Sequence, residues 1–343
     1  MNKKCIKGMT ELELIAWCKN LGQSSFRGRQ LYEWMYRQRA MSFQKMTNIS
    51  KTFRDYLVSN CSIRTLSIEK TLPSKFDKSI KFLFRTEDDN FIESVSMIDG
   101  SRHTVCISSQ IGCALDCSFC ETGKMGLKRN LSVGEIVDQL LIIRDFISQP
   151  ITNVVFMGMG EPFHNYKNVI NACDIFHSPF GCNLSSSRIT ISTAGMLPQI
   201  KKFIKEKNKY KLAISLNAAT NSVRNKIMPI NKKWTIEELI DVGKEYSKLK
   251  NRQVMFEYVL LKGVNDSLDD ANYLSYLLKG IPCKLNIIPY NETGDQFQRP
   301  KEEKIESFTN ILYDNRDEYR ILIRWSKGQD IAAGCGQLAT QKT

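Results

Sequence analysis

Three cysteines stand close together in one short run of the chain. Cys113, Cys117 and Cys120 form a C-x3-C-x2-C pattern. Three thiolates at this spacing can bind three irons of a [4Fe–4S] cluster and leave the fourth iron open to another ligand. Structural zinc sites favour C-x2-C pairs and fill all four positions around the metal. The run therefore predicts an iron–sulfur enzyme, and the alternative is three unrelated thiols in a loop.

The remaining cysteines indicate a reducing compartment. The chain has 11 cysteines, an odd number scattered along its length, which is not typical of a disulfide framework. Most of them, such as Cys173 and Cys283, are expected to be small buried side chains. No apolar run reaches the roughly 18 residues that span a bilayer, and no signal-peptide pattern follows the first methionine. We therefore expect a cytoplasmic protein with no membrane partner. A monomer is expected, although the sequence does not give the oligomeric state.

The charge balance favours an anionic partner. The chain carries 49 Lys and Arg against 36 Asp and Glu, a formal net charge of +13. Such an excess favours nucleic acid, whose phosphates attract a basic surface. A membrane surface fits less well, because the basic residues do not flank an apolar helix face. A solvated basic surface without a partner is the plain alternative.

The hydrophobic pattern predicts the elements ahead of the cysteine run. Residues 10–60 are expected to be helical, with Thr10 and Glu13 as a capping box and a second helix over Arg27–Arg39. Residues 63–97 alternate between apolar and polar side chains, as strands do.

Strands and helices alternate after residue 100. The predicted strands are Val105–Ser108, Asn153–Met157, Arg188–Ser192, Lys211–Ser215, Gln253–Leu261, Lys284–Pro289 and Arg320–Trp325. The helices between them begin at Ser132 with Glu135, at Thr235 with Glu238, and over Ser267–Leu278. This order favours an α/β fold, a partial (β/α)6 barrel with a small N-terminal helical domain and a short β-linker. No G-x-G-x-x-G follows the first strand, which disfavours a dinucleotide-binding sheet.

The predicted parts have definite limits. We expect a helical domain over residues 1–60, a β-linker over 61–98, the barrel over 99–330 and a C-terminal segment over 331–343. The basic helical domain is the candidate RNA-binding part.

Small polar residues follow the predicted barrel strands, where barrel active sites lie. Gly160 lets a ligand approach the backbone closely, and Glu161 can accept hydrogen bonds from an amine. Ser192, Ser215 and Asn217 follow the next two strands. These residues can line a pocket, and the alternative is that they form turns and helix caps.

Together these motifs resemble the radical S-adenosylmethionine superfamily. The cysteine run, the Gly-Glu-Pro that follows the second barrel strand and the small polar strand ends carry that resemblance. More narrowly, Met157-Gly-Met-Gly-Glu161, Met228-Pro-Ile-Asn-Lys-Lys and Cys335-Gly-Gln-Leu resemble the RlmN/Cfr group. These radical methyltransferases modify an adenine ring carbon in 23S ribosomal RNA. The resemblance runs over nearly the whole chain.

The resemblance implies two cofactors and their ligands. Cys113, Cys117 and Cys120 would bind one [4Fe–4S] cluster. S-adenosyl-L-methionine would bind its open iron, with Gly160 and Glu161 at the amino group. The residues that align with the rest of this cofactor's site are Ser192, Ser215, Leu216, Asn217 and Asn291.

The resemblance also implies three catalytic residues. Cys335 aligns with the cysteine that carries the methyl group, and Cys106 with the thiol that resolves the intermediate through a transient disulfide. Glu93 aligns with a proton acceptor. Without the resemblance, both cysteines would be taken as buried small residues and Glu93 as half of a surface ion pair.

Some positions depart from the group's pattern. Asn217 replaces a histidine, Glu121 adds a carboxylate after the cysteine run, and one acid is missing after Asp330. The segment Lys284–Asn291 resembles enzymes that methylate adenine C2, rather than C8, because the C8 type has arginine at Pro289.

The resemblance implies 23S rRNA as a partner, tRNA as a second substrate in some members, and an electron donor for the cluster. Two alternatives stay open. One is a non-catalytic, zinc-holding RNA-binding protein, and the other is a radical enzyme that acts on a protein or a small molecule.

Overall fold

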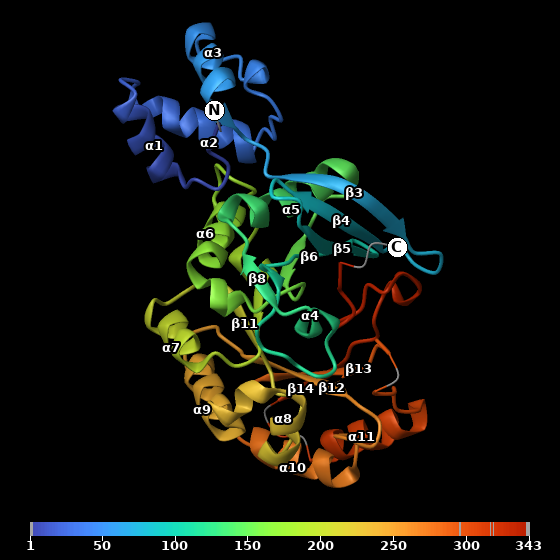
Figure 1. Cartoon of the computed structure of the whole chain (residues 1–343). Coiled ribbons are helices and arrows are strands. Elements are labelled where there is room, and N and C mark those ends of the chain that lie inside the picture. Colours follow the sequence, from blue (N-terminus) through green and yellow to red (C-terminus); the bar gives the residue numbers. More distant parts are fainter. Residues whose placement is uncertain (1–2, 295, 316, 318, 341–343) are drawn as a thin grey trace.

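The computed structural model describes residues 3–294, 296–315, 317 and 319–340, and it places a helical lobe on a larger α/β body (Figure 1). The lobe consists of α1 (Glu11–Asn20), α2 (Ser25–Tyr36) and α3 (Lys51–Asn60). Thr10 accepts a hydrogen bond from the backbone N–H of Glu13, and the Glu13 carboxylate accepts one from Thr10. The predicted capping box is therefore confirmed.

One sheet of ten strands runs through the body. Its order is β14-β13-β12-β11-β10-β9-β6-β5-β4-β3. The strands are β3 (Leu66–Pro73), β4 (Ile80–Thr86), β5 (Phe91–Asp99), β6 (Arg102–Cys106), β9 (Asn153–Phe156), β10 (Ile189–Thr193), β11 (Lys211–Ser215), β12 (Met255–Leu260), β13 (Lys284–Pro289) and β14 (Arg320–Ile323). From β6 through β14 all neighbours are parallel, whereas β3 to β6 form an antiparallel meander.

The parallel strands curl into a partial barrel. Thr104 on β6 and Leu322 on β14 line the same cavity, although five strands separate β6 from β14 in the sheet. The remaining helices are α4 (Glu121–Lys124), α5 (Val133–Phe146), α6 (Tyr166–His177), α7 (Leu197–Lys205), α8 (Asn221–Ile227), α9 (Ile236–Ser247), α10 (Leu268–Leu278) and α11 (Glu302–Asp314). The helices α6, α7 and α9 to α11 lie along the outside of the sheet (Figure 1). The predicted α/β barrel class is confirmed.

The helix starts follow local chemistry. Ser132 with Glu135 caps α5, and Thr235 with Glu238 caps α9, each as a reciprocal capping box. The strand ends differ from the sequence prediction by up to three residues. β6 begins at Arg102 rather than Val105, because Arg102 pairs with Asp99 of β5 across the hairpin. β3 to β5, which the sequence predicts as a linker, continue the barrel's own sheet.

Buried charges join the lobe to the body. The ammonium of Lys7 lies 3.3 Å from the carboxylate of Asp138 on α5, and both side chains are almost fully buried. Asp138 also accepts hydrogen bonds from the backbone and hydroxyl of Thr65. Arg144 of α5 donates to the backbone oxygen of Tyr36. The short strands β1 (Lys4–Cys5) and β2 (Cys61–Ser62) pair in parallel at the base of the lobe.

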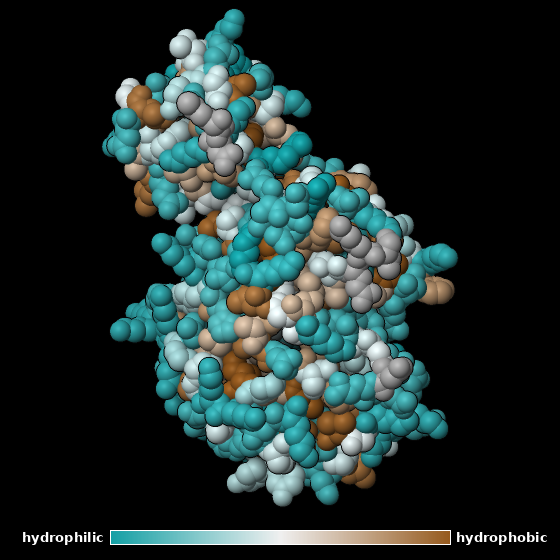
Figure 2. Space-filling view, viewed as in Figure 1, coloured by the Kyte–Doolittle hydropathy of each residue, from teal (hydrophilic) through white to brown (hydrophobic). Residues whose placement is uncertain are grey.

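The visible surface is polar. On the face in Figure 2, hydrophilic side chains dominate, and hydrophobic ones gather only in small patches. Within the described part of the chain, no helix combines the length and the apolar character that crossing a membrane requires.

Candidate active site

Two cavities meet at Cys335. The smaller has a volume of about 160 Å³ and is lined by residues at the carboxyl ends of the parallel strands. The larger has a volume of about 680 Å³ and reaches the residues with which those strands begin. Cys335 and Met157 line both. The smaller cavity brings together nine of the site residues predicted from the sequence: Cys113, Cys117, Cys120, Gly160, Glu161, Ser192, Ser215, Asn217 and Cys335.

A short hairpin fixes both ends of the cysteine loop. β7 (Gln110–Gly112) and β8 (Leu127–Asn130) pair in antiparallel fashion on either side of the loop. Gly112 has a φ of +76°, and a Cβ there would lie 1.8 Å from the backbone oxygen of Gly126. Only glycine therefore allows the two ends of the loop to come this close.

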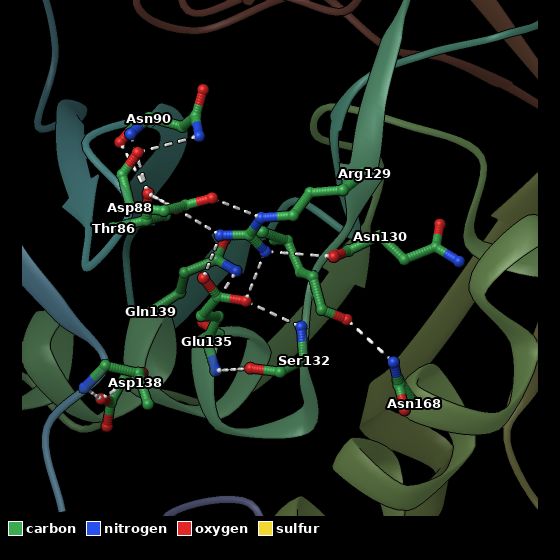
Figure 3. Close-up of polar contacts among 12 residues, drawn as sticks. Thr86, Asp88, Asn90, Arg129, Asn130, Ser132, Glu135, Asp138, Gln139 and Asn168 are labelled. Carbon is green, nitrogen blue, oxygen red and sulfur yellow. Dashed lines mark hydrogen bonds and ion pairs between the residues drawn. The ribbon is translucent and has the colours of Figure 1, made fainter. Parts of the chain in front are cut away.

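Arg129 ties this hairpin to the rest of the barrel (Figure 3). Its guanidinium lies 2.6 Å from Asp88 in the β4–β5 turn and 2.8 Å from Glu135 in the first turn of α5. The hydrogen bond from Arg129 holds the pKa of the Asp88 carboxyl well below its usual range. The arrangement fixes the stem of the cysteine loop from two sides.

The three cysteines face the smaller cavity together. Burial raises the pKa of the Cys113 thiol to about 12, and it also raises the pKa of the Cys117 and Cys120 thiols. Binding of a metal favours the thiolate and so opposes this effect of burial. No three His, Cys, Asp or Glu side chains among the described residues converge on a single metal ion. A four-iron cluster does not need such convergence, because each cysteine binds a different iron. The soft, three-thiol donor set fits that cluster.

A buried arginine places a positive charge close to Cys117. Arg224 of α8 donates to the backbone oxygens of Leu216, Ser215 and Ala194, which follow or end β10 and β11. Burial lowers its pKa to about 10, while the neighbouring Cys117 raises it. A cation here stabilises negative charge on the thiolates. Sequence reasoning missed Arg224, because a lone arginine in a short helix carries no signal of burial.

Glu161 offers a buried carboxylate to the smaller cavity. Its two oxygens accept hydrogen bonds from the backbone N–H groups of Phe163 and Ala194. Burial raises its pKa to about 7. The preceding Gly160 has a φ of +93°, and a Cβ there would lie 2.4 Å from the Cβ of Gln110. A bound ammonium group would favour the ionised carboxylate, so the position fits the predicted amine contact.

Glu257 on β12 is a cavity residue that sequence reasoning missed. Its Oε2 accepts hydrogen bonds from Ser192 at 2.6 Å and Ser215 at 3.4 Å. Its Oε1 is buried and has no hydrogen-bond partner among the described residues. Buried oxygens of this kind are rarely left unpaired, so the cavity is suited to a ligand that donates a hydrogen bond. The available signal was the inward alternation of Met255, Glu257 and Val259.

Three other residues that were predicted to bind the cofactor contact neighbouring protein atoms. Asn217 has a φ of +55°, which asparagine tolerates better than most residues. Its side chain accepts from the backbone of Val259 and donates to the sulfur of Met228. Leu216 is fully buried and lines neither cavity. Asn291 donates to the backbone oxygen of Cys335 at 3.4 Å and lines neither cavity.

Cys106 and Cys335 line the larger cavity together, and both thiols are free. Burial and then the neighbouring Cys335 raise the pKa of Cys106 to about 12. Burial also raises the pKa of Cys335, while the charge of Arg324 lowers it. Arg324 lines the same cavity and donates to the sulfur of Met157. Arg324 was not predicted from the sequence, because its partners are distant along the chain.

Two segments hold the loop that carries Cys335. The backbone N–H of Glu121 donates to Gly336, and the Thr122 hydroxyl donates to Leu338, so the cysteine loop binds the residues that follow Cys335. Farther back, Asp330 accepts hydrogen bonds from the hydroxyl of Ser74 and the backbone of Lys75 in the β3–β4 turn.

Glu93 is buried rather than exposed, but it lines neither cavity. Its carboxylate lies 3.2 Å from the ammonium of Lys81 and accepts a hydrogen bond from the backbone of Ala339. Burial raises its pKa even though Lys81 lowers it. Glu93 therefore forms a buried ion pair with Lys81, rather than the surface ion pair that is usual for a lone glutamate.

The partial barrel and the three-thiol cavity define a radical S-adenosylmethionine enzyme. The family model of the radical SAM superfamily matches residues 107–272. The model of the ribosomal RNA large subunit methyltransferase N-terminal domain matches residues 6–63, the helical lobe. Enzymes of the superfamily use a [4Fe–4S] cluster and S-adenosylmethionine, and the thiols and carboxylates described above fit both.

Full-length relatives narrow this class. The dual-specificity RNA methyltransferase RlmN 2 of Myxococcus xanthus (strain DK1622) is 45% identical, over 94% of this chain and 87% of the relative. The RlmN of Desulfotalea psychrophila (strain LSv54 / DSM 12343) is 40% identical, over 98% of this chain and 95% of the relative. The crystal structure of a radical SAM methyltransferase from Sphaerobacter thermophilus is 40% identical, with a TM-score of 0.93 over 98% of this chain and 100% of that one. The chain belongs to the RlmN family of radical SAM methyltransferases.

Proposed function

We propose that this protein methylates C2 of an adenine in 23S rRNA, at the family position A2503. The observation that carries the proposal is the place of Cys335, at the junction of the thiol cavity and a second cavity large enough for a nucleoside. The relatives are named dual-specificity RNA methyltransferases, which supports a second RNA substrate, with A37 of tRNA as the candidate.

The proposal assigns the bound cofactors to this chain's residues. Cys113, Cys117 and Cys120 would hold the cluster, and Gly160 and Glu161 would receive the amino group of S-adenosylmethionine. Ser192, Ser215 and Asn217, with Leu216 and Asn291 behind them, would complete that site. When bound, these cofactors supply the one-electron chemistry and the methyl group that an electron-poor ring carbon requires.

Three residues would then act on the substrate. The sulfur of Cys335 would carry the one-carbon group to the adenine. The Cys106 thiolate would then attack that sulfur to form the disulfide, the bond between the Cys335 sulfur and the transferred carbon would break, and the carbon would take the electron pair and a proton to become the methyl group. Glu93 accepts the ring proton. Its burial supports that role, since a carboxylate with a raised pKa is the stronger base. Glu93 must be reached by the substrate, so the Ala339 backbone that now binds its Oε2 would have to move.

The test of the carrier role is Cys335→Ala. We expect the variant to keep the cluster absorbance at about 400 nm. It should lose RNA methylation, because Cys335 is the cysteine of this loop and its thiol lines both the smaller and the larger cavity. Nucleoside mass spectrometry measures methylated adenosine in 23S rRNA and tRNA from a deletion strain that expresses the variant. Cys173→Ala is the matched control, because Cys173 is buried on α6 and lines neither cavity. A fully active Cys335→Ala would refute the carrier role.

The site of methylation has its own readout. Pro289 at the end of β13 matches the C2 type, so the product is expected to run with a 2-methyladenosine standard. An 8-methyladenosine product would overturn the C2 assignment and leave the methyl-carrier mechanism standing. A colourless, zinc-loaded protein would support the non-catalytic RNA-binding alternative.

A further inference from the structure

The larger cavity ends in a group of basic side chains. Arg102, Lys211 and Lys284 are the first residues of β6, β11 and β13, and Arg252 lies just before β12. All four line the cavity. Because the strands are parallel, their first residues meet at one edge of the barrel, opposite the cysteine run. We call these four residues the basic mouth.

A polar wall leads inward from the basic mouth. Alternate residues of a strand face the same side, and Arg102, Thr104 and Cys106 of β6 all line the cavity. Lys284 and Asn286 do the same on β13. Four residues of strand span about 13 Å, so Cys106 lies about that far from the mouth. Closed eight-stranded barrels fill this space with Val, Ile and Leu. This interior is instead hollow, and polar and apolar side chains share its lining.

The charges around the cavity are unbalanced. Six cations line it, the basic mouth together with Arg324 and Lys327, against a single acid, Asp99. Asp99 is already paired with Lys327 at 3.0 Å. In the described part of the chain, no ion pair includes Arg102, Lys211 or Lys284.

The cations at the mouth also repel one another. Burial and then the charges of Lys284, Arg188 and Arg102 lower the pKa of Lys211. Like charges held together in this way disfavour the folded state and favour binding of an anion. A volume of about 680 Å³ admits a single nucleoside but not a folded macromolecule.

We propose that substrate RNA lies across the basic mouth, with its backbone phosphates on Arg102, Lys211, Arg252 and Lys284, and that the target nucleotide enters the barrel from this side. The adenine then approaches Cys335 and Cys106 from the face opposite the cluster. An enzyme that modifies a base ring must take the nucleotide out of its stack, and phosphate contacts on either side hold the strand in register. The inference rests on the proposed RNA methylation and adds where the RNA binds.

The test is the double variant Lys211→Gln with Lys284→Gln, made in the cluster-loaded enzyme. Binding of in vitro transcribed 23S rRNA is measured by filter retention over a range of salt concentrations. Loss of two phosphate contacts should reduce the slope of log affinity against log salt by about 1.4–1.8. We expect affinity to fall about tenfold or more at low salt, while cluster absorbance and the mass of methylated Cys335 stay unchanged.

A matched control separates this site from general surface charge. Lys201→Gln with Lys205→Gln removes the same charge from exposed positions on α7, outside the barrel. An equal loss in this control would overturn the inference, and so would a double variant that binds and methylates RNA as the wild type does. If the double variant does not fold, the two single variants must each reduce the slope by about half as much. A wild-type enzyme that methylates no RNA would instead refute the proposed function.

Discussion

Single buried charges decide the chemistry of this site. Glu257 presents an unpaired oxygen to the cofactor cavity, and Arg324 lies beside the thiols of Cys106 and Cys335. A buried thiol is a poor nucleophile, because the thiolate is the reactive form. The positive charge of Arg324 opposes the effect of burial on Cys335. Under the proposed mechanism, Arg324 would be a positioning residue, because its charge favours the thiolate of Cys335.

Under the proposed mechanism, replacing Arg324 should change the pH dependence of the methylation of Cys335. In Arg324→Gln the pKa of Cys335 rises, so its thiolate forms only at higher pH. We expect the curve of Cys335 methylation rate against pH to move to the alkaline side, and each pH unit of that displacement lowers the rate at neutral pH about tenfold. Intact-protein mass spectrometry measures the rate. Arg324→Lys keeps the charge and should restore most of it; an unchanged curve in Arg324→Gln would contradict this role.

Residues of local motifs were predictable, whereas residues that act across the fold were not. The cysteine run carries its signal in its spacing, and Glu161 was predicted from its place after a strand together with the family resemblance. The structure places all four side chains in one cavity. Glu257, Arg224 and Arg324 work through partners that are distant in sequence, such as Ser192, and no local pattern specifies those contacts. Burial likewise cannot be predicted for a lone charged residue, which is usually exposed.

At the scale of elements, the site depends on a small hairpin that the sequence analysis left unassigned. β7 and β8 hold the cysteine loop, and Arg129 ties them to the β4–β5 turn and to α5 (Figure 3). The hairpin strands are three and four residues long. Strands this short lack a periodic signal, and only their pairing stabilises them. The longer barrel strands and capped helices were predictable because their patterns repeat.

Removing Arg129 should loosen the cysteine loop. Its side chain is 34% exposed and its partner Glu135 only 9%, so solvent screens the Asp88 contact more than the Glu135 contact. We expect Arg129→Ala to lower the free energy of unfolding by about 1–2 kcal/mol and to speed cluster loss to a chelator. Urea denaturation and the decay of cluster absorbance measure the two effects. Arg85→Ala, which removes the exposed pair with Asp89 in the same turn, should change neither.

For the whole molecule, a buried ion pair stands out among the contacts between the lobe and the body. Lys7 precedes α1, and its ion pair with Asp138 connects that part of the chain with α5. Thr65, which follows the lobe, donates two hydrogen bonds to the same Asp138 carboxylate. Breaking a buried pair leaves the partner charge unsatisfied, which costs more than an exposed pair contributes. Because the lobe and the barrel share this contact, their relative placement is part of the folded state.

The change Asp138→Ala tests this joint. The variant leaves the ammonium of Lys7 buried without its carboxylate partner. We therefore expect the free energy of unfolding to fall by about 3–5 kcal/mol, or the lobe to detach before the barrel unfolds. Trp17 and Trp34 lie in the lobe, so their fluorescence reports on the lobe once Trp234 and Trp325 of the body are replaced by phenylalanine. Comparing this fluorescence with far-ultraviolet dichroism during denaturation distinguishes the two outcomes. Arg39→Ala removes the exposed pair with Asp145 and is the control. A loss no larger than the control's would contradict the role of the buried pair.

The contacts between the cysteine loop and the Cys335 loop have a consequence for synthesis. Cys335 follows Cys120 by 335 − 120 = 215 residues. At about 5–20 residues per second, the ribosome makes that stretch in roughly 10–40 s. During that interval the nascent cysteine loop lacks Gly336 and Leu338, the partners of Glu121 and Thr122. The cysteine run is thus made long before the segment that binds it, and Cys335 reaches its place only after the rest of the barrel has been synthesised.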